Sequence, residues 1–262
     1  MGCYQRIVVG TDGTDTGQLA VAVAGAVATR FDIPVTTLTA WKESARKSTI
    51  GPEEAVRIGE QAVAELVEAG VEQVSRLDLP GAAGTVLLEA VEGEPATLLV
   101  VGARGLGRSK SRLTGSTANH ISHHSPTDVL FTHKVPKRWT TVGLATDGSP
   151  GSILAVRRGY EVARTLGARP FLVTAAKTDD EGADTLIAVE GAVDVAEPEL
   201  FGHDVLTGVP AAEALCNAAW KYDLMVIGNR GMSGPARLLG SVANKVTHDI
   251  ETNLLLVNTS RL

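Results

Sequence analysis

The chain has 262 residues, of which 44% are hydrophobic, 21% charged and 4% aromatic. This apolar content excludes a wholly disordered chain, and a formal net charge of -6 disfavours non-specific nucleic-acid binding as the main role. The two cysteines, Cys3 and Cys216, exclude a disulfide framework. No apolar run reaches the ~20 residues that span a bilayer. We therefore expect a cytoplasmic protein that binds neither membranes nor nucleic acids.

In chain order, the first half of the sequence predicts alternating strands and helices. Residues 6–10 form a short apolar run, which suits a strand buried on both faces. Thr14 is the predicted N-cap of the helix that follows, and Gly70 is expected to end the second helix. The predicted strands are 6–10, 35–40, 74–79, 97–101 and 128–132, and the later helices start at Pro52 and cover 85–91 and 116–124.

Three segments of the first half recur in the same order in the second half. Residues 6–14 (RIVVGTDGT) recur as 141–149 (TVGLATDGS), residues 98–105 recur as 224–231, and residues 115–119 recur as 240–244. Chance is a poor explanation for three ordered matches. We therefore predict two homologous domains, residues 1–136 and 137–262.

Alternating strands and helices predict an α/β fold, in which each domain is a parallel sheet with helices on both faces. In such folds, ligands bind beyond the carboxyl ends of the strands, at the point where the strand order reverses. Asp12 follows the first predicted strand, and Gly102 and Gly105 follow the fourth. These residues are therefore the first candidates for a binding site.

The glycines after the fourth strand follow the spacing Gly102-x2-Gly105-x9-Gly115-Ser116. Such glycines let backbone N–H groups approach an anion, and a helix that starts at Ser116 would direct its positive end toward phosphate. Four basic residues lie in the same loop: Arg104, Arg108, Lys110 and Arg112. The pattern indicates a polyphosphate site; the alternative is that the glycines only turn the chain and the charges are solvated. Neither G-x-x-x-x-G-K-[ST] nor G-x-G-x-x-G is present.

Residues 8–14 (VVGTDGT), the glycine loop and residues 123–130 (HHSPTDVL) together resemble the universal stress protein family. Both halves match, so the resemblance covers nearly the whole chain. It implies two Rossmann-like domains of the adenine nucleotide alpha hydrolase-like kind, each with a five-stranded parallel sheet of order 3-2-1-4-5. It also implies binding of ATP with Mg²⁺ and a regulatory role in the stress response.

The resemblance also implies which residues contact the nucleotide. Beside the adenosine it places Gly10, Thr11 and Asp12, with Ala40 near the adenine. The residues expected to contact the ribose and the phosphates are Gly102, Gly105, Gly115, Ser116 and Thr117. Arg104 and Arg108 would neutralise the phosphate charge. The matching positions of the second domain are Ala145, Thr146, Asp147, Gly228, Gly231, Gly240, Ser241 and Val242.

The second domain departs from this pattern in its glycine loop. Eight residues, rather than nine, separate Gly231 from Gly240, and Pro235 removes a backbone donor. Arg237 is the one basic residue between these glycines, and Ala145 replaces a glycine of the first domain. We therefore predict that the first domain is the better nucleotide binder.

Several other features have a structural interpretation. His120 and His124 are spaced as a metal-binding pair, but no cysteine or spaced carboxylate accompanies them, which favours a solvated or packing role. The acidic segment 178–199 is expected to be a solvated loop, with a partner-binding flap as the alternative. Trp220 is expected to pack, and Cys216 to be buried as a small apolar residue.

The last predicted strands of the two domains, 128–132 and 253–258, are apolar and lie at sheet edges, which favours pairing. The resemblance implies that the domains form an intrachain pseudo-dimer through these strands, and two chains can associate further as a homodimer.

Three functions are consistent with the sequence. The favoured one is an ATP-binding regulatory protein without dedicated catalysis. The first alternative is a slow ATPase, but neither glycine loop contains an evident carboxylate that could activate water. The second is a nucleotide-independent interaction scaffold, which the complete glycine loop of the first domain disfavours.

Overall fold

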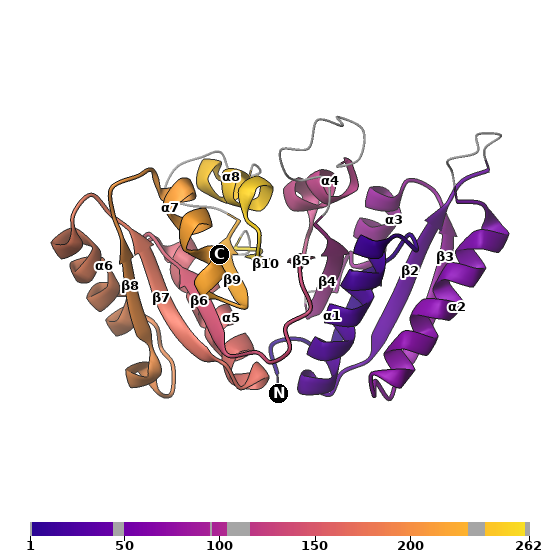
Figure 1. Cartoon of the computed structure of the whole chain (residues 1–262), viewed down its shortest axis with the longest axis horizontal. Helices are drawn as coiled ribbons and strands as arrows, with labels where there is room; N and C mark the ends of the chain where they lie inside the picture. The colour runs from indigo at the N-terminus through magenta and orange to yellow at the C-terminus, as the bar shows by residue number, and fades with distance from the viewer. Residues whose placement is uncertain (1, 44–49, 95, 104–115, 230–238, 260–262) are drawn as a thin grey trace. The chain divides into compact units, whose positions relative to one another are not determined.

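A computed structural model describes residues 2–43, 50–94, 96–103, 116–229 and 239–259. The chain separates into two compact units, Met1–Val135 and Pro136–Leu262, called here unit 1 and unit 2. Each unit is built from alternating strands and helices (Figure 1). No helix in the described part of the chain is long and apolar enough to cross a membrane.

Unit 1 contains a parallel sheet of five strands. Its elements are β1 (Arg6–Gly10), α1 (Asp15–Phe31), β2 (Val35–Trp41), α2 (Pro52–Glu68), β3 (Val74–Pro80), α3 (Ala83–Ala90), β4 (Thr97–Gly102), α4 (Ser116–His124) and β5 (Asp128–Thr132). The strands lie in the order β3-β2-β1-β4-β5, and each neighbouring pair is parallel. The predicted order 3-2-1-4-5 is confirmed.

Local sequence signals define the start and the end of α1. The Thr14 hydroxyl accepts a hydrogen bond from the backbone N–H of Gly17 at 3.3 Å, and Asp15 lies in the first turn, where its charge interacts favourably with the helix dipole. The helix ends before Asp32, whose φ of 53° is left-handed. The predicted N-cap at Thr14 is therefore confirmed.

The helices of unit 1 cover both faces of its sheet (Figure 1). The chain passes from β1 to β2 to β3 in one direction and then returns across the sheet to β4 and β5. Because such crossovers are right-handed, α1 and α2 lie on one face and α3 and α4 on the other. In agreement, α1 packs against α2, and α3 packs against α4. The strand order therefore reverses between β1 and β4.

Unit 2 repeats this architecture. Its elements are β6 (Thr141–Ala145), α5 (Pro150–Leu166), β7 (Arg169–Ala175), α6 (Asp179–Ala192), a 3₁₀ turn (Pro198–Leu200), β8 (Gly202–Leu206), α7 (Ala211–Ala218), a second 3₁₀ turn (Ala219–Lys221), β9 (Leu224–Gly228), α8 (Ser241–Asp249) and β10 (Asn253–Val257). The strands lie in the order β8-β7-β6-β9-β10, again with parallel neighbours. The order is the same as in unit 1.

The expectation of a solvated loop at residues 178–199 is wrong, because most of this segment is the helix α6. The Thr178 hydroxyl accepts a hydrogen bond from the backbone N–H of Glu181 at 3.2 Å and caps the helix. Asp179, Asp180 and Glu181 fill the first turn, where negative charge interacts favourably with the dipole. The acidic cluster is therefore a helix-start signal.

The expected packing role of Trp220 is also wrong, since this side chain is 78% exposed. The two residues that follow it contact Asp204 of β8 instead. Lys221 Nζ lies 2.8 Å from Asp204 Oδ2, and the Tyr222 hydroxyl donates to the same oxygen at 2.7 Å. Burial, together with this hydrogen bond, raises the pKa of Tyr222. Cys216 is half-buried, and burial raises its pKa to about 11.

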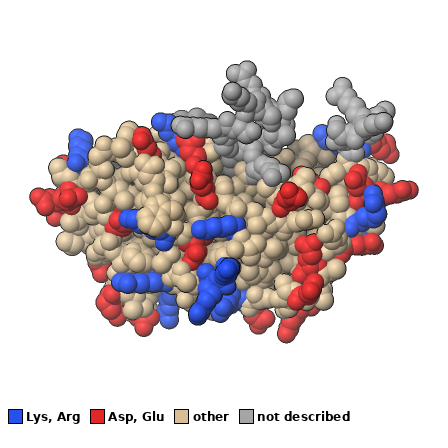
Figure 2. Space-filling view, viewed as in Figure 1, with Lys and Arg blue, Asp and Glu red and all other residues tan. Residues whose placement is uncertain are grey.

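Charged side chains of both signs are interspersed on the face seen in Figure 2. Some of them are paired: Arg76 contacts both Glu60, at 3.1 Å, and Asp78, at 3.0 Å. The Arg76–Glu60 pair is exposed at Glu60 and contributes little to stability.

Candidate functional site

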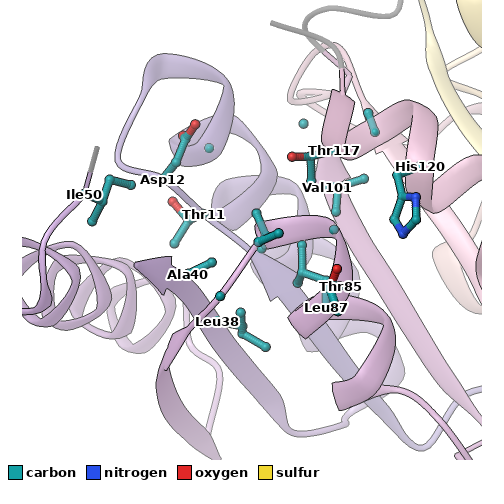
Figure 3. A pocket seen from close by; sticks show the side chains of 18 of the residues that line it. Thr11, Asp12, Leu38, Ala40, Ile50, Thr85, Leu87, Val101, Thr117 and His120 are labelled. Atoms are coloured by element: carbon teal, nitrogen blue, oxygen red, sulfur yellow. The ribbon is translucent and has the colours of Figure 1, made fainter. Parts of the chain in front are cut away.

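A cavity of about 600 Å³ lies in unit 1 at the carboxyl ends of β1, β2 and β4. Its volume falls within the ~300–1,000 Å³ that is typical of small-molecule sites. Figure 3 shows Thr11 and Asp12 after β1, Leu38 and Ala40 on β2, and Thr117 on α4 around this space. The cavity therefore lies where the strand order reverses, as the fold predicts.

The loop after β1 is held in place by hydrogen bonds within the loop and to β2. Asp12 Oδ1 accepts hydrogen bonds from the backbone N–H of Thr14 at 3.1 Å and from its hydroxyl at 2.5 Å. The backbone N–H of Thr11 donates to the carbonyl of Leu38 at 3.1 Å. Gly13 has a φ of 73°, which glycine adopts at no steric cost. These contacts fix the Asp12 carboxylate at the cavity wall.

Two glycines of the site allow helices to lie directly against strand ends. A Cβ at Gly102 would lie 2.7 Å from the carbonyl oxygen of Thr16 in the first turn of α1. A Cβ at Gly10 would lie 2.9 Å from Leu87 Cδ1 of α3. At Gly102 the neighbour is backbone, so a larger residue would push the two walls apart, whereas at Gly10 the end of the Leu87 side chain could move instead.

The starts of three helices border the cavity. Thr16 lies in the first turn of α1, Ala83 in that of α3, and Thr117 in that of α4. Ala82 precedes α3 and offers no side-chain acceptor to the first N–H groups of that helix. Lys42 adds a positive charge to the described lining. Helix starts and a lysine together favour an anionic ligand.

The cavity brings together many of the nucleotide contacts expected from the sequence. It is lined by Gly10, Thr11, Asp12, Ala40, Gly102 and Thr117. Ser116 is the first residue of α4. The remaining positions lie outside the described residues: Arg104, Gly105, Arg108 and Gly115, together with Lys110 and Arg112.

The sequence interpretation missed one wall of the cavity, at the start of α3. Residues 81–85 (GAAGT) line the cavity there, directly after the strand that ends at Pro80. A run of small residues between a strand and a helix leaves the backbone accessible, and this run was the available signal. Lys42 and Ile50 were missed too, and nothing in their local sequence distinguishes them. His120 was noted for its spacing from His124 but was not expected at this cavity.

The corresponding cavity of unit 2 is smaller, at about 180 Å³. Seven of the positions expected from the sequence line it: Ala145, Thr146, Asp147, Gly228, Gly240, Ser241 and Val242. The eighth, Gly231, lies outside the described residues. The loop after β6 repeats the loop after β1. Asp147 Oδ1 accepts hydrogen bonds from the backbone N–H of Ser149 at 3.1 Å and from its hydroxyl at 2.5 Å. The same framework therefore encloses less space.

The histidines of α4 interact with each other. The rings of His120 and His124 stack with centroids 4.5 Å apart, and His124 Nδ1 lies 2.8 Å from the carbonyl oxygen of His120. Within the described ranges, no group of three or more His, Cys, Asp or Glu side chains could hold a metal ion.

Comparisons with known proteins agree with this architecture. The Universal stress protein Rv2623 of Mycobacterium tuberculosis is 25% identical over 97% of this chain and 96% of its own length. The crystal structure of a universal stress protein from Archaeoglobus fulgidus covers 98% of both chains with a TM-score of 0.73 and 17% identity, which shows the shared fold. A universal stress protein solved in complex with cAMP is 30% identical, covers 51% of this chain and 99% of its own, and has a TM-score of 0.45.

The model of the universal stress protein family matches the chain twice, at residues 3–133 and at residues 138–258. These two matches fall on unit 1 and unit 2 and each includes a cavity at a strand-order reversal. The chain belongs to the universal stress protein family and carries the family's domain in tandem.

Proposed function

We propose that this protein is an ATP-binding regulatory protein of the cytoplasm, and that its nucleotide lies in the unit 1 cavity. The observation that carries the proposal is the 600 Å³ cavity at the reversal of strand order, bordered by the starts of α1, α3 and α4 and by Lys42. A polyphosphate needs such a concentration of backbone N–H groups and positive charge.

The lining fits the two ends of a nucleotide. Leu38, Ala40 and Leu87 offer apolar surface to an adenine ring, and the fixed Asp12 carboxylate can accept a hydrogen bond from the adenosine. The phosphates are assigned to the start of α4, beside Thr117. From the sequence pattern we add contacts to Arg104, Gly105, Arg108, Gly115 and Ser116. Mg²⁺ would accompany the nucleotide through its phosphate oxygens.

Binding without dedicated catalysis suits the described lining better than hydrolysis does. Asp12 is the one carboxylate among the described residues that line the cavity, and its Oδ1 already accepts two hydrogen bonds from Thr14. A general base has to reach the attacking water, and the assignment of Asp12 to the adenosine end places it away from the γ-phosphate. A slow ATPase is the second candidate function, and a nucleotide-independent scaffold is the third.

Mass spectrometry of the denatured, freshly purified protein tests the proposal. We expect an adenine nucleotide, and for the emptied protein a higher melting temperature with millimolar Mg-ATP. Multiple-turnover phosphate release that is lost in Gly102→Ala would favour the ATPase. An empty protein with no thermal shift would favour the scaffold.

A further inference from the structure

His120 lies at the rim of the unit 1 cavity, on the helix whose start is assigned to the phosphates. It follows Thr117 by three positions on α4, and both residues line the cavity (Figure 3). Residues three apart on a helix lie on the same face, with Cβ atoms about 5–6 Å apart. A positive charge on the exposed His120 ring would therefore act on a bound phosphate across only a few ångströms.

The His120 ring is held by packing rather than by hydrogen bonds of its own. A Cβ at Gly84 would lie 2.9 Å from His120 Cδ2, so the ring rests directly against the backbone at the start of α3. The ring also stacks on that of His124, with centroids 4.5 Å apart and planes at 28°. His124 Nδ1 donates to the His120 carbonyl, because a carbonyl oxygen only accepts. Among the described residues nothing hydrogen-bonds to the His120 ring nitrogens, which leaves them to a ligand.

Few charges surround this histidine in the described structure. The ionisable side chains of the cavity lining and of the two helices beside it are Asp12, Lys42, Glu89, His123 and His124. Neither of these carboxylates forms an ion pair with His120, and Glu89 lies five positions after Gly84 and hence on another side of α3. The described residues of the site therefore offer no contacting anion that would hold a proton on His120, whereas a bound polyphosphate would supply one.

We propose that His120 is a further phosphate-binding residue, that it binds the nucleotide as an imidazolium, and that binding in unit 1 therefore takes up a proton. This proposal rests on the proposed function and adds a regulation to it. Histidine is the side chain whose charge ordinarily changes between pH 5 and pH 8. Because a protonated ring attracts phosphate far more strongly than a neutral ring does, affinity for the nucleotide should rise as the pH falls through this range. Charging both stacked rings is disfavoured, so we expect one proton rather than two.

Calorimetric titration of Mg-ATP into the full chain at pH 6, 7 and 8 measures this coupling. Excess Mg²⁺ keeps the ATP in one form across the series, and the pKa of His133, about 4, keeps that residue neutral throughout. We expect the Kd to be about threefold to tenfold lower at pH 6 than at pH 8, the effect of one added charge near the phosphates. Repeating the pH 7 titration in buffers of different ionisation enthalpy counts the protons directly, and we expect uptake of a fraction of a proton per ATP bound.

Three variants assign the proton to His120. His120→Gln keeps a polar side chain of similar size that cannot be charged, so its Kd should be the same at pH 6 and pH 8. His120→Lys is charged at both pH values, so its Kd should again be the same at both, and lower than that of His120→Gln. His124→Gln removes the stacked ring and should keep the pH dependence. His203→Gln, at a partly exposed histidine of unit 2, is the matched control and should behave as the wild-type chain.

Two results would overturn the proposal while leaving ATP binding, and with it the proposed function, intact. One is a Kd that does not change with pH in the wild-type chain, with no proton taken up. The other is a pH dependence that survives in folded His120→Gln; if it is lost in His124→Gln instead, the proton belongs to that ring. No binding of Mg-ATP at any pH would contradict the proposed function, and the role of His120 with it.

Discussion

Replacing Gly102 with alanine should impair the unit 1 site, and the structure gives the size of the effect. The new Cβ would lie 2.7 Å from the Thr16 carbonyl oxygen, whereas ordinary contacts begin at 3.4 Å. The end of β4 and the start of α1 must therefore separate by about 0.7 Å. Overpacking of this kind costs roughly 1–3 kcal/mol of the free energy of unfolding. Because the neighbour is backbone, a side-chain rotation cannot relieve it.

The same displacement should weaken nucleotide binding. A hydrogen bond from a wall N–H to phosphate that is lengthened by ~0.7 Å is effectively lost, and hydrogen bonds to charged groups contribute ~1.5–3 kcal/mol each. The Kd for Mg-ATP, measured by calorimetry on the full chain, should rise at least about tenfold. Gly191→Ala is the control, because its Cβ meets nothing within 4 Å. Unchanged stability and affinity in Gly102→Ala would refute the assignment of this wall.

Three further predictions concern single side chains. Burial lowers the pKa of His133 to about 4, so as the pH falls the unfolded chain takes up a proton before the folded chain does. The free energy of unfolding should therefore fall by up to about 2 kcal/mol from pH 7 to pH 5. Urea unfolding should show a smaller loss over this pH range in His133→Gln. Burial raises the pKa of Cys216 to about 11, so at pH 8 iodoacetamide should alkylate it far more slowly than an unfolded control peptide; equal rates would contradict this burial. Thr178→Ala removes the cap of α6 and should cost about 1 kcal/mol in thermal unfolding, whereas Thr178→Ser should cost little.

The alternation of strands and helices and most of the element limits could be predicted because local signals agreed, whereas the strand order came from the family resemblance. The apolar run at β1, the Thr14 cap and the internal repeat each pointed to the same α/β unit. The position of the cavity followed from the same rule, since ligands bind where strand order reverses. Asp12 and Gly102 could thus be placed at the site before any side chain was located.

The parts that failed depend on tertiary contacts or on competing signals. Asp179, Asp180 and Glu181 carry the charge of a solvated segment, yet after Thr178 the same charge stabilises a helix start. Trp220 was expected to pack, but its side chain is exposed, and the following residues Lys221 and Tyr222 bind Asp204 instead. The wall at the start of α3 could not be found from periodicity, because residues 81–85 meet the cavity only when β3 and β4 are placed in the sheet.

Calorimetric titration of Mg-ATP into the nucleotide-free, full-length protein tests the central claim most directly. We predict a saturable signal with one ATP bound per chain, lost or strongly weakened when the unit 1 cavity is filled by Thr117→Phe. No binding to protein shown to be nucleotide-free would contradict the claim, and so would binding that is unchanged in the folded Thr117→Phe variant.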